Sequence, residues 1–155
     1  MSTLPAFLDA FVAALQLRGG LAGVRVFGCP VVPEDLGEEG IELAEEVSVD
    51  TSRDSMNSER EDYTVNGSVL VLAPMVRGAS PQSTINATAK VARDRCNAIV
   101  AEVADELLTD CTVGGVVVDA QLDGITFHQG MAPEGQMGRA CWCEFSVKVW
   151  AGDDL

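Results

Sequence analysis

Residues 80–108 read SPQSTINATAKVARDRCNAIVAEVADELL, and this stretch carries the strongest periodic pattern of apolar residues in the chain. Ser80 followed by Pro81 is typical of a helix start, because the serine hydroxyl caps free backbone N–H groups and proline fits the first turn. Apolar or small residues then recur at three- and four-residue steps, which predicts one buried helical face. They are Ile85, Ala89, Ala92, Cys96, Ile99, Val103 and Leu107. The pattern predicts a helix from 81 to 108.

A second helix is predicted over residues 4–17, near the start of the chain. Thr3 before Pro5 gives the same combination of a capping hydroxyl and a proline in the first turn. Gly19-Gly20 ends the pattern, as glycine commonly does after a helix. The apolar face of this helix consists of Leu4, Phe7, Leu8, Phe11, Ala14 and Leu15.

Strands are predicted where apolar and polar residues alternate. The pattern predicts strands at residues 24–27, 41–49, 63–72, 122–131 and 141–150, with a turn at 132–136. Residues 116–118 are a short apolar run and a further candidate strand. Glu45 interrupts the apolar face of the second strand, which favours an edge position. Gly67 is a candidate bulge in the third strand. Leu70 and Leu72 occupy the other face of that strand, so this end of the sheet is expected to be covered on both sides.

The last strand has two different faces. Its inner face is apolar and consists of Cys141, Cys143, Phe145, Val147 and Val149. Its outer face carries Trp142 and Trp150. An outward tryptophan on an antiparallel strand either packs under a helix or is buried at a partner interface, where tryptophan is enriched. The sequence gives these two alternatives equal weight.

The order of helix, short strand, large hairpin, long helix and closing hairpin predicts the α+β class. Two helices are expected to cover one face of a mixed or antiparallel sheet built of hairpins. At 155 residues, of which 47% are apolar, the chain is long enough to form one domain with its own core. We therefore expect a single domain over residues 1–155, with a flexible tail at about 151–155.

An acidic segment at residues 34–62 holds 12 of the 24 carboxylates and only two basic residues, Arg53 and Arg60. Its second half has almost no side chain to bury, so a long polar loop is predicted at about 50–62. Long loops without secondary structure are uncommon and are usually functional or disordered. The acid density at residues 34–46 is higher than the predicted architecture requires.

The net charge of −14 argues against binding to nucleic-acid phosphates, which requires clustered lysine and arginine. The closest basic group, Lys90, Arg93 and Arg95 on the long helix, is interpreted as a solvated helix face. No export segment is recognisable, and no apolar run reaches the ~18 residues of a membrane-spanning helix. These features predict a cytoplasmic protein, whose five cysteines are then expected to be free thiols.

Candidate catalytic and metal-binding groups are few. Cys141 and Cys143 lie on one strand face, but a structural zinc site needs four ligands. The other candidates are Cys29, Cys96, Cys111 and His128. Their spacing in the sequence does not predict that these residues meet Cys141 and Cys143 in the fold. Packing of the cysteines in the core is therefore the preferred interpretation. His128 is the sole histidine, and we interpret it as a surface or hydrogen-bonded strand residue.

Other patterns that carry chemistry are weak. The adjacent glutamates at 38–39 and 45–46 point to opposite faces of a strand and do not converge on a site. Asp50-x-Ser52-x-Asp54 lacks the glycine and the closing glutamate of a calcium loop. Neither a phosphate-binding loop nor a Gly-x-Ser-x-Gly elbow occurs. We therefore predict no enzyme activity, no metal and no cofactor.

The layout of these elements resembles the tail terminator proteins of long-tailed bacteriophages, also called tail-completion or neck proteins. The matching pieces are the helix at 4–17, the hairpin around residues 50–62, the helix at 81–108, and the closing hairpin that ends at 139–151. Together they span nearly the whole chain. The likeness is one of architecture, because the family has no short diagnostic motif.

The resemblance implies a ring, commonly of six copies, that caps the finished tail tube and stops its polymerisation. The implied partners are further copies of the chain, the tail tube protein and the head-tail connector or stopper protein. DNA would pass through the lumen without specific binding, and no membrane is involved. A structural role in the virion tail or neck follows, after assembly in the host cytoplasm and without catalytic residues or cofactors.

By position, the 50–62 segment and the 131–138 tip are expected to reach neighbouring subunits, the tube or the connector. With the outward tryptophans they give the candidate interface residues Arg53, Asp54, Met56, Asn57, Glu59, Arg60, Met131, Glu134, Met137, Trp142 and Trp150. A loop that becomes ordered on docking would explain why so polar a segment is kept.

Three other functions compete with this one. The first is another neck component, such as a head-completion or minor tail protein. The second is a small enzyme or ligand-binding domain, which would need a concave site with convergent polar groups. The third is an acidic module that binds a basic protein or mimics DNA, and it predicts a monomer with salt-sensitive binding.

Overall fold

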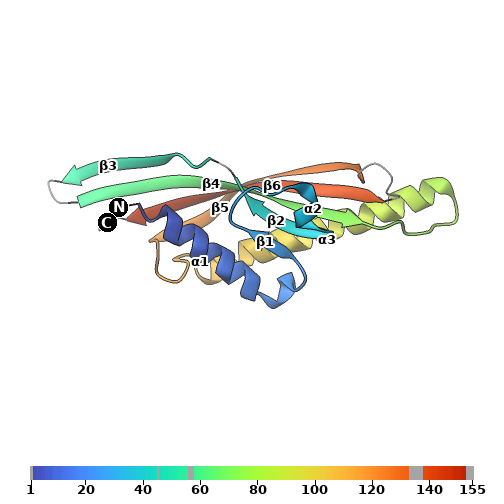
Figure 1. Cartoon of the computed structure of the whole chain (residues 1–155), viewed down its shortest axis with the longest axis horizontal. Coiled ribbons are helices and arrows are strands. Elements are labelled where there is room, and N and C mark those ends of the chain that lie inside the picture. The colour runs from blue at the N-terminus through green and yellow to red at the C-terminus, as the bar shows by residue number, and fades with distance from the viewer. Residues whose placement is uncertain (1, 45, 56–57, 133–137, 153–155) are drawn as a thin grey trace.

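The computed structural model describes residues 2–44, 46–55, 58–132 and 138–152. The chain forms an elongated molecule with a long sheet and its main helices on one side (Figure 1). In chain order the elements are α1 Leu4–Leu17, the 3₁₀ turn η1 Gly19–Leu21, β1 Arg25–Phe27, α2 Pro33–Leu36, β2 Glu39–Leu43, β3 Val49–Ser55, β4 Ser58–Ala73, α3 Pro81–Thr109, β5 Asp119–Met131 and β6 Arg139–Gly152. The predicted α+β class is confirmed.

The sheet is organised around β4, a strand of 16 residues. On one edge β4 pairs antiparallel with β6, from Glu61 opposite Gly152 to Ala73 opposite Arg139. Its other edge is shared, because β2 pairs with residues 67–71 and β3 pairs with residues 58–63. β1 adds to β2 in parallel, and β5 adds to β6 antiparallel, which gives the order β1-β2-β4-β6-β5 with β3 beside β4.

The predictions for residues 41–62 need two corrections. The single strand expected at 41–49 is divided, because β2 ends at Leu43 and β3 begins at Val49. β2 lies between β1 and β4 and not at an edge, whereas Glu45 lies outside the described residues. The polar loop expected at 50–62 is mostly a two-stranded ribbon, with Asp50 opposite Asp62. A ribbon held by backbone hydrogen bonds needs no apolar side chains, so a search for buried patterns misses it.

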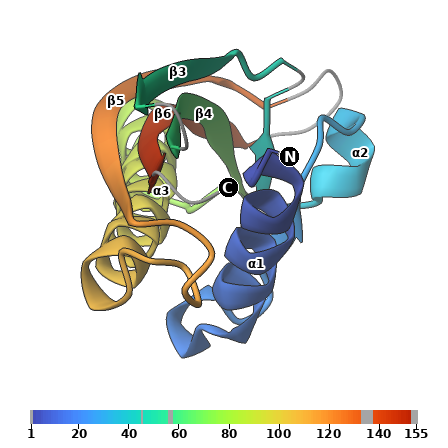
Figure 2. The same cartoon turned by 90° about the vertical axis from the view of Figure 1, so that its left-hand side faces the viewer.

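α1 and α3 lie on the same face of the sheet (Figures 1 and 2), as predicted. From α1, the core receives Phe7, Phe11 and Leu15. From α3 it receives Thr88, Ala92, Cys96, Ile99, Val100, Val103 and Leu107. Burial of a large apolar side chain contributes about 1.5–3 kcal/mol, so these two stripes, together with the inner face of the sheet, stabilise the fold.

The long helix begins as its sequence predicts. The Ser80 hydroxyl accepts a hydrogen bond from Ser83 N, and the Ser83 hydroxyl accepts one from Ser80 N, which forms a reciprocal capping box. The first turns of α3 extend past the neighbouring strands at one end of the molecule (Figure 1). Ile85 is 47% exposed for this reason, although its spacing places it on the predicted buried stripe.

Gly67 has a packing role and does not form the predicted bulge. It stays in regular register, opposite Leu43 on one side and Phe145 on the other. A Cβ atom at this position would lie 2.5 Å from Cζ of Phe145. Glycine is therefore required here because the buried phenylalanine ring occupies the space of a side chain. The register shift between β4 and β6 falls at Glu61 and Asp62 instead.

The strand predicted at 116–118 is absent, and residues 111–118 form turns in its place. Val113, Gly114 and Gly115, just before the predicted strand, have the positive φ angles of a turn, 47°, 71° and 80°, and the N–H of Val117 donates back to the Thr112 carbonyl. The Asp110 carboxylate stabilises the first turn by accepting hydrogen bonds from Thr112 Oγ1 and from the backbone N–H groups of Thr112 and Gly114. The bond from the Thr112 hydroxyl is the main cause that lowers the pKa of Asp110 below its usual 3.8.

Candidate assembly surface

The sheet face opposite α1 and α3 is a candidate surface for assembly. It displays alternate residues of β4 and β6, and among the described residues neither long helix covers it. From β4 these are Arg60, Asp62, Thr64, Asn66, Ser68, Leu70 and Leu72, and from β6 they are Trp142, Glu144, Ser146, Lys148 and Trp150. The two strands therefore place one tryptophan toward each end of a largely polar face.

A groove at the end of the sheet that carries β3 surrounds Trp150. We call it the acidic groove; it has a volume of about 1070 Å³, and its charged lining residues are Glu46, Asp50, Arg60, Asp62, Asp119 and Lys148. The Arg60 guanidinium carbon lies 5.5 Å from the centre of a Trp150 ring, and Arg60 Nε lies 3.1 Å from Asp62 Oδ2. Four carboxylates against two cations give this groove a negative potential around an aromatic floor.

A second groove lies toward the opposite end of the same face. We call it the apolar groove; it has a volume of about 940 Å³, and it is lined chiefly by Leu70, Leu72, Met75, Met131, Ala140 and Trp142. The His128 ring stacks on Trp142 with ring centres 5.3 Å apart and an interplanar angle of 14°. His128 Nε2 lies 3.7 Å from Glu144 Oε2 and has no hydrogen-bond partner in the described structure. His128 is thus a half-buried strand residue that fixes the tryptophan ring.

The covering of this end of the sheet is partial. Leu36 of the short helix α2 is buried and packs over Gly40, so closely that a Cβ there would lie 2.7 Å from Leu36 Cδ2. Leu70 and Leu72 remain half-buried beside the apolar groove. The predicted second layer therefore exists over β2 but leaves a concave apolar surface next to it.

The predicted interface residues fall into distinct groups. Arg60 and Trp150 meet in the acidic groove, and Met131 and Trp142 line the apolar groove. Arg53 and Asp54 belong to β3 and Glu59 belongs to β4, with Arg53 opposite Glu59 in the ribbon. The others, Met56, Asn57, Glu134 and Met137, lie outside the described residues. Trp150 is 40% exposed, and Trp142 is half-buried in a groove that it shares with Pro33 and Glu34 of α2; a partner interface stays a prediction for both tryptophans.

Glu61 is a buried structural side chain whose role the sequence did not reveal. It is only 3% exposed, and its Oε1 accepts hydrogen bonds from Ser2 Oγ, Thr3 N and Thr3 Oγ1. The Thr3 hydroxyl is also 3.0 Å from Tyr63 Oη and makes no capping bond within α1, which corrects the predicted N-cap. A carboxylate beside the first turn of a helix is favoured by the helix dipole, so Glu61 anchors α1 to β4.

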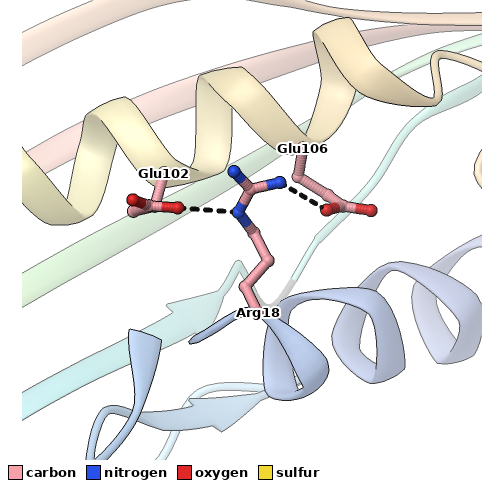
Figure 3. A network of polar contacts seen from close by, with 3 residues as sticks. All are labelled: Arg18, Glu102 and Glu106. Carbon is pink, nitrogen blue, oxygen red and sulfur yellow. Dashed lines mark hydrogen bonds and ion pairs between the residues drawn. The ribbon is translucent and has the colours of Figure 1, made fainter. Parts of the chain in front are cut away.

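Arg18 makes the corresponding link at the other end of α1 (Figure 3). Its Nε donates to Glu102 Oε2 and its Nη1 donates to Glu106 Oε2, both at 2.8 Å. The hydrogen bonds to Glu106 and Glu102 raise the pKa of Arg18. Because Glu102 and Glu106 lie four residues apart on α3, the guanidinium also neutralises two carboxylates that would otherwise repel each other.

The basic residues of α3 do not form a uniformly solvated face. Lys90 pairs with Asp94 on the next turn, and Arg93 Nη1 donates to Gln129 Oε1 on β5. Arg95 forms a two-point ion pair with Glu39, with distances of 2.8 Å and 3.0 Å. Glu39 is thereby given a structural role within the dense acidic segment at residues 34–46.

The cysteines separate into two classes. Cys96, Cys141 and Cys143 are buried in the core, as predicted, and Cys29 and Cys111 are exposed. Burial is the main cause that raises the pKa of Cys143 to about 11, so this thiol stays protonated and unreactive. In the part of the chain that the structure describes, no three His, Cys, Asp or Glu residues gather closely enough to hold a metal ion.

No helix in the described ranges combines the length and apolarity needed to cross a membrane.

Comparison with known proteins gives little further assignment. No protein family model matches the chain, and no curated protein matches it. Among solved structures, a chain from the "Virion of native gene transfer agent (GTA) particle" is similar, with 16% sequence identity and a TM-score of 0.47. The match covers 94% of this chain and 93% of the other, and at this level of similarity it assigns no function.

Proposed function

We propose that this chain is a structural protein of a phage-like particle, of the tail terminator kind. In this proposal several copies form a ring at the end of the tail tube, stop its growth and present a face to the head connector. The role is assembly and not catalysis. The site of action is the tail or neck of the virion.

The observation that carries the proposal is the uncovered sheet face with a tryptophan in a groove toward each end. Trp150 is 40% exposed and Met131 is 77% exposed, although both are large apolar side chains on regular strands. Exposed aromatic residues in grooves with polar rims are typical of the centres of protein interfaces. A chain that must bury two such grooves is suited to assembly with several neighbours.

The arrangement of the elements gives further support. The two helices, the central hairpin and the closing hairpin occur in the order expected from the tail terminator layout. The β3–β4 ribbon, residues 49–55 and 58–63, overlaps β6 at residues 61–63 and continues to Ser55 opposite Ser58, past Glu61, where β6 ends at Gly152. A projecting polar ribbon can reach a neighbouring subunit or the tube without exposing apolar surface in the free chain.

The charge of the chain agrees with a channel for DNA. A net charge of −14 repels phosphates and would let DNA pass without sticking to the lumen. In this proposal the partners are other copies of the chain, the tail tube protein and the connector or stopper protein.

The first test is a tube-capping assay. Purified chain is added to tail tube protein during polymerisation, and tube lengths are measured by negative-stain electron microscopy. We expect tubes that stop growing and carry a ring at one end; native mass spectrometry should give about 98 kDa for six copies of 16.3 kDa. An unchanged length distribution, with no density at either tube end, would contradict the proposal.

Trp142→Ala and Trp150→Ala test the surface itself. Each is expected to keep the far-ultraviolet circular dichroism of the wild type but to reduce capping by roughly tenfold or more, the scale of an aromatic hot spot. Val91→Ala is a matched control, because Val91 is an exposed apolar residue on α3, away from the open face. Equal losses in the control and the tryptophan variants would argue against this surface.

A further inference from the structure

Charge is distributed unequally along the long axis of the molecule. At one end, the first turns of α3 lie beside the end of β4 and the start of β6, and at the other end lie β3 and the start of β4 (Figure 1). The first end carries Arg77, Lys90, Arg93 and Arg139. We call it the basic end, although Asp94 pairs with Lys90 there, and Glu34 and Glu38 line the adjoining apolar groove that shares Met75. The second end contains the acidic groove.

The basic end also has an apolar centre. A shallow groove with a volume of about 640 Å³ is lined there by Met75, Arg77, Pro81, Ile85, Thr88 and Arg139. Met75 is 40% exposed and Ile85 is 47% exposed. Two cations, Arg77 and Arg139, therefore flank an apolar patch that is partly exposed in the described part of the chain.

The acidic groove has the complementary composition. Its floor is formed in part by Trp150, and its rims carry Glu46 and Asp50 on one side and Asp119 on the other. If the basic end of one molecule meets the acidic groove of another, the apolar patch around Met75 and Ile85 faces Trp150. The cations of the basic end then face the carboxylates of the groove. Matching potentials of this kind speed association and set its orientation.

We propose that the basic end of one copy docks into the acidic groove of the next copy, so that copies associate head to tail. The inference rests on the proposed self-assembly and identifies the surfaces that carry it. Because the two surfaces differ, the contact is heterologous, and it closes into a ring when the rotation between neighbours divides a full turn. One chain can then fill two interfaces with its two ends.

Charge reversal at each end tests the inference. Arg77→Glu with Arg139→Glu reverses the basic end, and Glu46→Lys with Asp50→Lys reverses the acidic groove. Self-association of the purified full chain is measured by sedimentation velocity over a concentration series at low and high salt. Each double variant is expected to associate at least roughly tenfold more weakly than the wild type.

Mixing the two double variants supplies the decisive readout. In the mixture the unchanged ends form the wild-type contact, and the two reversed ends form the same contact with opposite signs. The dissociation constant of the equimolar mixture is therefore expected to lie within about threefold of the wild-type value. This ratio corresponds to a difference of less than about 1 kcal/mol in the free energy of association. Recovery in the mixture alone cannot arise from damaged folding of either variant.

A matched control separates local from overall charge. Asp9→Lys with Asp105→Lys changes the net charge of −14 by the same amount as the acidic-groove variant, at exposed positions on α1 and α3. This control is expected to associate at least as well as the wild type, because it reduces overall repulsion. If the basic-end double variant fails to fold, Arg77→Glu alone replaces it.

Two results would overturn the inference. One is a wild type that stays monomeric at every concentration and salt level, and the other is a mixture that associates no better than its components. Neither result bears on tube capping, which is measured separately. Capping with a failed charge swap would keep the proposed function and reject this interface.

Discussion

The Glu61 carboxylate accepts hydrogen bonds from both the backbone and the hydroxyl of Thr3, across a separation of 58 residues. The contact fastens the start of α1 to the strand that organises the sheet. It also explains why a glutamate is buried in a segment that otherwise faces water. The adjacent Asp62, on the opposite face of the strand, forms a surface ion pair with Arg60.

Replacing Glu61 with alanine is expected to lower the free energy of unfolding by about 1–3 kcal/mol, because Thr3 N–H loses its partner. Urea denaturation followed by circular dichroism measures the loss. Asp62→Ala is the control and should cost less than about 1 kcal/mol. Equal costs for the two neighbours would show that the anchor contributes nothing specific.

Arg18→Ala is expected to destabilise the chain more than removal of either carboxylate partner alone. The substitution leaves Glu102 and Glu106 facing each other on α3, in addition to the lost hydrogen bonds. A double-mutant cycle with Glu106→Gln should give a coupling energy of about 0.5–2 kcal/mol that decreases with added salt. A coupling energy of zero at low salt would show that the ion pair between Arg18 and Glu106 does not stabilise the fold.

Gly67→Ala is expected to cost about 1–3 kcal/mol, because the new methyl group overlaps the Phe145 ring. Gly124→Ala provides the control, since a Cβ there meets no atom within 4 Å. Phe145→Leu combined with Gly67→Ala should cost less than the sum of the two single changes. The three variants can be compared by urea denaturation, and strictly additive costs would contradict the proposed contact.

Asp110 should contribute to acid sensitivity. Its pKa in the folded state is lowered, chiefly by the Thr112 hydroxyl, so its contribution to stability is present above the usual pKa of 3.8. That contribution is lost as the pH falls through the lower folded pKa. The difference in melting temperature between wild type and Asp110→Asn is therefore expected to be larger at neutral pH than at acid pH, where the Asp110 carboxylate is protonated in the folded state. A constant difference over this range would contradict the assignment.

The tip of the β3–β4 ribbon can be removed without disturbing the sheet. Replacing residues 53–59 with Asn-Gly joins Ser52 to Arg60, which already face each other, through a two-residue turn. We expect the shortened chain to retain its melting temperature within a few degrees and to lose tube capping. Full capping by the folded variant would show that the ribbon tip is not a docking element.

Local periodicity predicted the parts of this fold that depend on nearby residues. Ser80-Pro81 and the apolar stripe after it predict α3, because the cap and the first turn are made within four residues. Alternation predicts β6 and its two faces equally well, since side chains of any strand alternate. The same alternation placed Trp142 and Trp150 on the outer face, although it left open what covers them.

Amino-acid sequence thus determined the two long helices, the long strands β4 and β6 over most of their length, and the α+β class, because burial and capping leave local patterns. Tertiary structure alone decided which residues meet. The polar ribbon depends on backbone pairing, Gly67 on the position of Phe145, and Glu61 on Thr3 at the far end of the chain. The two grooves likewise combine side chains from several strands, and contacts at such separations depend on sheet register, which no single segment encodes.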